Sequence, residues 1–349
     1  MWRPCGTFDE TYAKDMAIVR TWRHWATLIA ALVALFLLPL WGPYYLVAFM
    51  NNLAVTIIAV LGLQIVSGYC GQISFGQAAF MAVGAYASAI LTLKGGVSFW
   101  VALPLSGLLT GVFGLIGGAP SLRIKGFYLA MATIAIHFVT MWLILHLEIT
   151  GATAGLNPAP PSIGSYSFDT DERIYYIIIP VMLIMTYGAR NLARTRVGRT
   201  FVAIRDNDLA AQVMGVNLFY YKMLAFFISC VYAGIAGSLW AHMVQVVHPE
   251  QFTLLHALWY IGMLIVGGMG SIPGVFFGAV FIRILDELVL SVSPVLAGWF
   301  PWLGQAPAAA LGVSAFGVVI TVFLLREPRG LAHRWEIVKA STRLYPFAH

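Results

Sequence analysis

The sequence predicts an all-α polytopic membrane protein with about ten transmembrane helices, some of them broken or re-entrant, and with both termini in the cytoplasm. Composition is the first observation behind this fold class. The chain has 349 residues, of which 60% are hydrophobic and only 10% charged, and its mean hydropathy is +0.84. An average soluble domain is about a quarter charged. Water is therefore not the main solvent of this chain.

Ten apolar stretches are the second observation. A hydrocarbon core roughly 30 Å thick requires about 20 apolar residues per helix. The candidate spans are residues 26–42, 45–66, 72–93, 98–119, 126–147, 174–189, 223–245, 252–268, 273–291 and 308–325. The stretches 174–189 and 252–268 are short for a full crossing, and several others contain glycine or proline. Broken or re-entrant helices are expected there.

The distribution of basic residues is the third observation, because short cytoplasmic loops retain Lys and Arg. Of the 20 basic residues, 17 lie in four segments that share one side of the membrane when ten spans are counted. These segments are an arm at residues 1–25, a loop with Arg123 and Lys125, the segment 190–222 and a tail at residues 326–349. The membrane core, residues 26–325, then has both termini inside and a periplasmic loop at 148–173.

Several function classes are excluded by what the sequence lacks. No basic stripe follows a helix face, so nucleic-acid binding is not expected. Cys5, Cys70 and Cys230 lie far apart and are interpreted as packing residues. The histidines of the second half have no ligand spacing, so no metal site is predicted. No catalytic motif and no GxxxxGK[ST] loop occurs, so the chain is not expected to be an enzyme or to bind a cofactor.

The segment 190–222 is the longest polar interruption of the chain. It contains five arginines, and residues 203–217 within it have the sequence AIRDNDLAAQVMGVN. One interpretation is a basic loop that anchors orientation and binds lipid head groups. The other is a short surface helix that docks on a partner. Asp206 or Asn207 is suited to cap such a helix, and Gly215 to end it in a left-handed conformation.

A glycine-rich stretch, GYCGQISFGQAAFMAVGAY, occupies residues 68–86. Four glycines with Gln72, Ser74 and Gln77 make a poor continuous hydrophobic helix. They would supply a bent entry and polar groups facing a cavity. The alternative is helix–helix packing by small residues.

These two segments resemble the permease subunits of branched-chain amino-acid ABC importers, the LivM and LivH family. The same resemblance extends to three further stretches: TGATAGL at 150–156, GGMGSIPG at 267–274 and PRGL at 328–331. It covers roughly residues 45–331 in the expected order. Cys70 and Ala152 are small departures, at positions where family members commonly have Gly. Leu209 stands where many other importers have Glu, a departure from the general importer signature that is usual in this family.

The resemblance implies roles for individual residues. The coupling helix that contacts an ATPase would include Arg205, Asp206, Asp208, Ala210, Ala211 and Gly215. The candidate solute pathway would include Gly71, Gln72, Ser74, Gly76, Gln77, Gly84, Thr150, Gly151 and Gly155. A structural turn would be formed by Gly267, Gly268, Gly270 and Gly274.

The resemblance also implies partners and a location. A periplasmic solute-binding protein would deliver a small solute, most often a branched-chain or hydrophobic amino acid, to this chain and a second, LivH-like permease subunit. Two ATP-binding subunits would hydrolyse ATP on the inner side of a bacterial cytoplasmic membrane, and membrane lipids would surround the complex. Permeases for urea, short amides and aromatic compounds are similar, so the resemblance does not determine which solute is transported.

An ion-coupled secondary transporter is the alternative from a different class. Its usual mark is a carboxylate deep in the membrane, whereas acidic residues are absent from Met16 to Leu147. Arg283 and Glu287 could pair at i,i+4 as local compensation, with a solute site as the alternative. His137 is interpreted as a hydrogen-bonded core residue, with a proton relay as the alternative.

Overall fold

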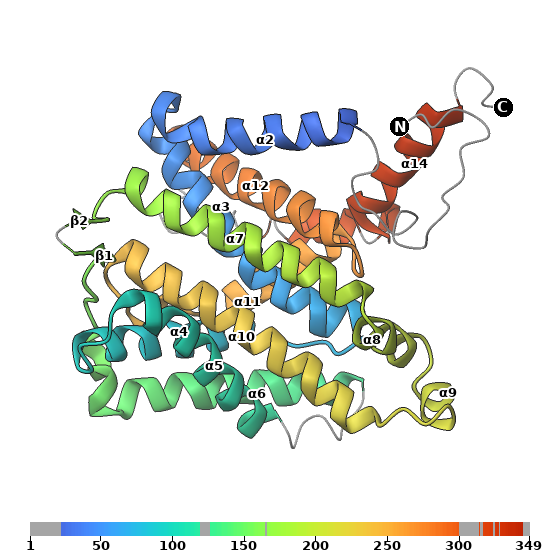
Figure 1. Ribbon diagram of the computed structural model, residues 1–349, viewed down its shortest axis with the longest axis horizontal. Helices are drawn as coiled ribbons and strands as arrows, with labels where there is room; N and C mark the ends of the chain where they lie inside the picture. The colour runs from blue at the N-terminus through green and yellow to red at the C-terminus, as the bar shows by residue number, and fades with distance from the viewer. Residues whose placement is uncertain are drawn as a thin grey trace.

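A computed structural model describes residues 22–118, 126–164 and 166–299, together with 314, 317–323, 325–327 and 329–344. The predicted basic loop with Arg123 and Lys125, Pro328, and the first 21 residues of the N-terminal arm lie outside the described residues. The arrangement of the elements is shown in Figure 1.

The described residues are mostly helical, which confirms the all-α prediction. The α-helices are α2 (Trp22–Trp41), α3 (Tyr44–Leu63), α4 (Gln77–Leu93), α5 (Phe99–Gly118), α6 (Phe127–His146), α7 (Asp171–Arg194), α8 (Arg196–Asp206), α9 (Asp208–Val213), α10 (Leu218–Val244), α11 (Leu254–Gly267), α12 (Ile272–Trp299) and α14 (Gly330–Leu344). Short helical turns are η1 (Gln64–Tyr69), η3 (Glu148–Thr150), η4 (Ala152–Ala154) and η5 (Pro249–Gln251). A small antiparallel hairpin pairs β1 (Ser162–Ile163) with β2 (Tyr166–Ser167).

Five of the described helical segments are long and apolar enough to cross a membrane: Tyr44–Tyr69, Phe99–Gly118, Tyr128–His146, Asp171–Arg194 and Leu218–Val244. Two shorter apolar helices are Trp25–Trp41 and Gln77–Leu93. Inside a bilayer the backbone groups must be satisfied within the chain, and helices do this by themselves. The chain is therefore a multi-pass membrane protein, while the count of ten spans and the side of each terminus remain predictions.

The helices found in the structure begin and end at other residues than three of the predicted stretches. The stretch 174–189, expected to be short, belongs to the 24-residue helix α7, because polar and charged residues at both ends of the apolar run continue the helix. The stretch 72–93 becomes helical only at Gln77. The stretch 252–268 remains short, since α11 has 14 residues.

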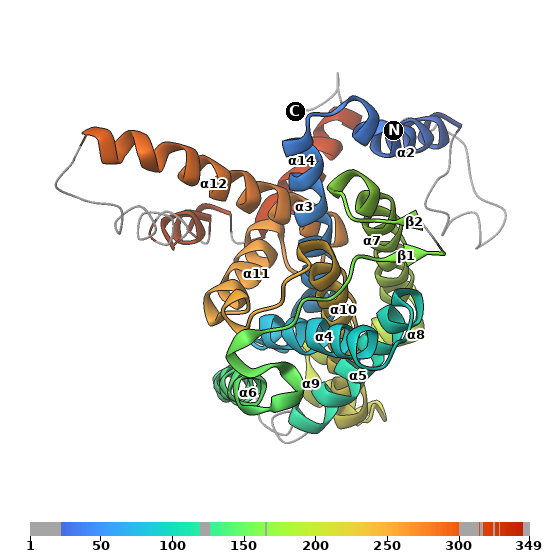
Figure 2. The ribbon, with the colours of Figure 1, turned by 90° about the vertical axis from the view of Figure 1, so that its left-hand side faces the viewer.

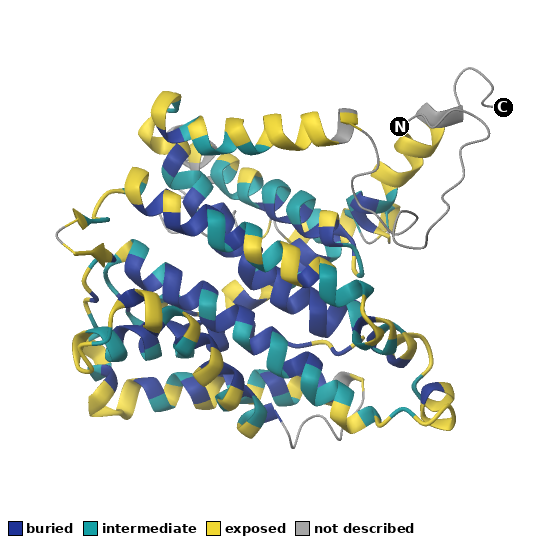
Figure 3. Ribbon diagram, viewed as in Figure 1, coloured by how far each residue is buried: buried dark blue, intermediate teal, exposed yellow. Residues whose placement is uncertain are grey.

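Helix α10 lies at the centre of the bundle, where it packs against α3, α4 and α5. Buried residues concentrate on these helices, whereas α2 and much of α14 are exposed (Figure 3). From the second viewpoint α12 extends away from the other helices (Figure 2). The core of the chain therefore surrounds α3, α4 and α10.

Close packing of α5 on α10 depends on small side chains. Gly107, Gly111 and Gly114 all lie on the side of α5 that faces α10, and a Cβ added to Gly114 would lie 2.3 Å from the Cys230 sulfur. The opposite side of α5 exposes apolar residues such as Leu108 and Ile116. Small residues at helix contacts and large apolar residues outside are typical of helices packed in lipid.

Candidate functional site

The glycine-rich stretch forms a break between two helices. At its start, η1 is a π-helical turn, in which the amide of Cys70 donates to the carbonyl of Ile65 across 3.2 Å. Residues 71–76 then have no helical structure until α4 begins at Gln77. Gly71 has φ +73°, a conformation that favours glycine. The predicted bent entry is thus present, and π-helical turns occur frequently at functional sites.

The polar side chains of this break are buried, but they differ in what they bind. Gln77 donates to the carbonyl of Ala59 across 2.7 Å and accepts from the Ser229 hydroxyl at 3.2 Å. It therefore ties α4 to α3 and α10. Ser74 accepts from the amide of Gly76 at 3.4 Å. Both side-chain amide atoms of Gln72 are buried without a hydrogen-bond partner among the described residues.

Gly84 lies in a contact between α4 and α10. A Cβ added there would lie 2.3 Å from the Cα of Gly234. The stretch therefore combines both interpretations of its glycines: those near residue 71 open the chain, and Gly84 allows two helices to pack closely.

The predicted capped surface helix is α9. The side chain of Asn207 accepts from the amide of Ala210 across 3.0 Å, which caps the helix. Gly215, at φ +86°, reverses the chain after it. Asn217 in turn caps α10 by accepting from the amide of Tyr220 at 3.1 Å. The helix is held between two side-chain caps, as the Asp/Asn-rich sequence indicates.

The outward face of α9 is more apolar than the sequence indicates. Ala211 is buried at 5% exposure, so this small side chain packs on its own chain. Leu209, Val213 and Met214 instead expose 66%, 87% and 84% of their surface. Large exposed apolar side chains grouped on one short helix mark an interaction surface.

Arg205, the penultimate residue of α8, joins this segment to the glycine-rich break. Its Nη1 donates to the carbonyl of Gly68 across 3.0 Å, and its Nε donates to Asp206 at 3.0 Å. A Cβ on Gly71 would lie 2.9 Å from Cγ of Arg205, and one on Gly270 would lie 2.9 Å from Nη1. Three stretches that the resemblance treats separately therefore meet around one guanidinium group.

A cavity of about 340 Å³ lies between the glycine-rich break and the residues around Arg205. Gly71 and Gln72 line one side, and Arg205, Asp208 and Lys222 line the other. Lys222 and Asp208 approach to 3.8 Å. The cavity is polar and contains charges of both signs, so a movement of α8 and α9 would change the surroundings of Gln72.

Cys70 lines the same cavity, yet its side chain is buried at 2% exposure. Burial raises the pKa of the Cys70 thiol to about 12, and the charge of Lys222 opposes this shift. The thiol is therefore protonated at neutral pH, which agrees with its interpretation as a packing residue.

The predicted pathway residues of the loop after α6 lie apart from this cavity. Thr150, Gly151 and Gly155 lie near the opposite ends of the helices, where Leu156 forms a β-bridge with Val247. Gly155 allows this approach, because a Cβ there would lie 2.4 Å from the Val247 carbonyl oxygen. These residues are not brought together with Gln72 by the structure.

The Gly267–Gly274 turn connects α11 to α12. Gly268 and Gly270 have φ +112° and +85°. A Cβ on Gly267 would lie 2.0 Å from the carbonyl oxygen of Gly274. These positive φ angles and close approaches favour glycine in the connection.

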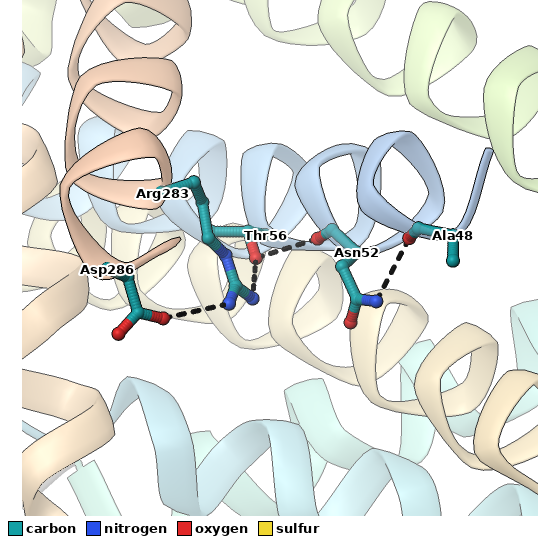
Figure 4. Close-up of polar contacts among 5 residues, drawn as sticks. All are labelled: Ala48, Asn52, Thr56, Arg283 and Asp286. Carbon is teal, nitrogen blue, oxygen red and sulfur yellow. Dashed lines mark hydrogen bonds and ion pairs between the residues drawn. The ribbon is translucent and has the colours of Figure 1, made fainter. Parts of the chain in front are cut away.

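Arg283 on α12 contacts α3, a connection that the sequence did not indicate (Figure 4). Its Nη2 donates to the Thr56 hydroxyl at 2.9 Å, and its Nη1 lies 3.8 Å from Asp286. The predicted pair with Glu287 is wrong, because the guanidinium is directed toward α3 while Glu287 lines a cavity with Tyr45. Sequence spacing alone could not reveal a contact across 227 positions.

The sequence also did not indicate a buried network near the loop at residues 148–173. Ser238 donates to Ser88, and the Ser88 hydroxyl lies 3.0 Å from Nε2 of His242. Nδ1 of His242 lies 2.9 Å from the Ala159 carbonyl oxygen. The network holds the loop on α4 and α10. His137 is buried as expected, but its Nδ1 has no hydrogen-bond partner among the described residues.

Comparisons with known proteins agree with the resemblance. Residues 45–325 match the family described as "Branched-chain amino acid transport system / permease component". The chain is 31% identical over 258 residues to "High-affinity branched-chain amino acid transport system permease protein LivM" of Salmonella typhimurium, and equally to that of Escherichia coli. It is 28% identical over 242 residues to "Autoinducer 2 import system permease protein LsrC" of Enterobacter sp..

The matched regions cover 67% of this chain and 61% of each LivM protein, so less than two thirds of those relatives is spanned. For LsrC the shares are 66% and 68%. No solved structure matches.

Proposed function

Because this chain belongs to the family of permease components of branched-chain amino acid transport systems, we propose that it is the membrane-spanning subunit of an importer powered by separate ATP-binding subunits. It would form the solute pathway with a second permease subunit. A periplasmic binding protein would deliver the solute to the side of the 148–173 loop. The chemistry of ATP hydrolysis would belong to the partners.

The contact between Arg205 and Gly68 is the observation that carries this proposal. In the proposed importer, α9 contacts an ATP-binding subunit through Leu209, Val213 and Met214. Closure of the ATP-binding subunits moves α8 and α9, and Arg205 transmits that movement to the break at residues 68–76. A break in a helix is able to change shape without disrupting the regular helices on either side.

We propose a branched-chain or other hydrophobic amino acid as the solute, since both LivM relatives are named for branched-chain amino acid transport. The LsrC relatives are named for a different solute, so the test compares solute classes. The amide of Gln72, which has no hydrogen-bond partner among the described residues, and the cavity next to it are proposed to belong to the inner part of the pathway.

Uptake by the reconstituted complex tests this function. The chain is co-expressed with the permease, ATP-binding and solute-binding subunits encoded beside it, and uptake of leucine is measured with and without ATP. ATP-dependent leucine uptake is expected. Uptake driven by an ion gradient without ATP would contradict the proposal, and no heat on mixing the binding protein with leucine in calorimetry would remove the proposed solute.

A further inference from the structure

A second cavity, separate from the one beside Gln72, lies between the last turn of α7 and the start of α12. Its volume is about 490 Å³, within the range of roughly 300–1,000 Å³ typical of small-molecule sites. The residues that decide its chemistry are Tyr69, Arg190, Arg194, Ser271, Phe276 and Phe277. The proposed pathway and the contacts of α9 do not use this cavity.

One wall of the cavity is strongly basic. Arg190 and Arg194 are one helical turn apart on α7, so both guanidinium groups lie on the same side of the helix. Like charges at this spacing repel each other. No acidic side chain lines this cavity among the described residues. An anion would therefore be favoured by both arginines.

The start of α12 adds to this preference. The helix begins at Ile272, and the Ser271 hydroxyl accepts from the amide of Gly274 at 3.3 Å. Ser271 and Ile272 both line the cavity. The N-terminus of a helix carries a partial positive charge, which favours phosphate groups.

The opposite wall is apolar and aromatic. Pro273, Phe276 and Phe277 of α12 line it, whereas Ala193 lies beside Arg194 on α7. Phe276 and Phe277 are only partly buried, and Pro273 is exposed. A free inorganic anion would gain nothing from this wall, whereas an amphiphile would place its charge on the arginines and its hydrocarbon on the rings.

The position of the cavity indicates where such an amphiphile would come from. Arg194 is the last residue of the span Asp171–Arg194, so the cavity lies where the span leaves the hydrocarbon core. Basic pockets between transmembrane helices at this depth bind anionic lipid head groups. We propose that this cavity binds the phosphodiester head group of an anionic phospholipid, with its acyl chains along Phe276 and Phe277.

Lipid titration followed by native mass spectrometry tests this site on the full chain co-purified with its partner subunits. Phosphatidylglycerol and phosphatidylcholine with identical acyl chains are compared. The wild type should retain phosphatidylglycerol preferentially. In R190Q/R194Q the affinity for phosphatidylglycerol should fall roughly 25-fold, because each basic residue near an anionic membrane surface contributes about a factor of five.

The matched control is R196Q/R199Q, which removes two exposed arginines from the adjacent helix α8. It should keep the preference. A193W retains both charges but fills the cavity between α7 and α12, so it should also lose phosphatidylglycerol. The proposal is overturned by equal loss in both double variants, by an unchanged A193W, or by equal retention of the two lipids.

Inorganic phosphate and the partner subunits supply the remaining arms of the test. Phosphate at millimolar concentration should not displace the lipid, and displacement would identify a free-anion site instead. The separate chain should bind the lipid as the complex does. Binding by the separate chain that disappears in the complex would show that a partner protein occupies the cavity, which also overturns the proposal. Neither readout depends on uptake of any solute.

Discussion

The Arg205 guanidinium donates a hydrogen bond to the carbonyl of Gly68 across 3.0 Å, although the two residues are 137 positions apart. Gly68 lies in the π-helical turn η1 and Arg205 in the penultimate position of α8. The side chain of Arg205 is about one third exposed, at 35%. Arg205 thereby connects the surface helix α8 to the break at residues 68–76 in the buried part of the bundle.

Charge introduced on the outward face of α9 should prevent assembly with the ATP-binding subunits. In V213E and M214E an apolar contact is replaced by a carboxylate that would lose water on docking. Each side chain is more than four fifths exposed, at 87% and 84%, so folding of the chain should be unaffected.

Co-purification of the tagged chain with its ATP-binding subunits measures this effect. Q212E, which alters an exposed polar residue of the same helix, is the control and should retain them. Normal recovery of the ATP-binding subunits with both V213E and M214E would show that α9 does not form the docking surface.

Replacing Gly84 by valine should destabilise the folded chain. The new Cβ would lie 2.3 Å from the Cα of Gly234, so α4 and α10 would have to move apart. Overpacking of this kind costs about 1–3 kcal/mol. Thermal unfolding of the detergent-solubilised protein should therefore shift to lower temperature.

G317V serves as the control for this change, because no atom of the residues that the structure describes lies within 4 Å of a Cβ added at Gly317. An unfolding temperature of G84V equal to that of G317V would mean that the two helices do not approach as described.

The Cys70 thiol should react slowly with maleimide in the folded protein near neutral pH. Its raised pKa, about 12, keeps the thiol protonated until the solution is strongly alkaline, and the thiolate is the reactive form. Labelling is measured in a C5S/C230S background and should become rapid only after denaturation. Rapid labelling of the native chain without ATP would show that the cavity beside Cys70 is open at rest.

Composition and local pattern were sufficient for much of the fold. Long apolar runs predict helices because the bilayer forces backbone groups to bond within a segment. The cap at Asn207 follows from its hydrogen-bonding side chain, and the reversal at Gly215 follows from the conformational freedom of glycine. These features depend on residues close together in the sequence.

Contacts between distant segments could not be predicted in this way. Periodicity places Arg205 on a surface helix, but nothing in it indicates that the guanidinium lies against Gly68, or that Arg283 reaches Thr56. The exposure of Met214 and the burial of Ala211 likewise depend on how α9 packs, since both are uncharged residues of one short helix. The sequence therefore indicates which segments form the candidate site, but not how their side chains contact one another.

The proposed link between α8 and the break is tested by measuring solute-stimulated ATP hydrolysis in the reconstituted complex with R205A, with R196A as the matched control. R205A should assemble normally but hydrolyse ATP without stimulation by the loaded binding protein and transport no solute, because the hydrogen bond to Gly68 is lost. R196A should behave as the wild type. Undiminished stimulation and uptake in R205A would contradict the link.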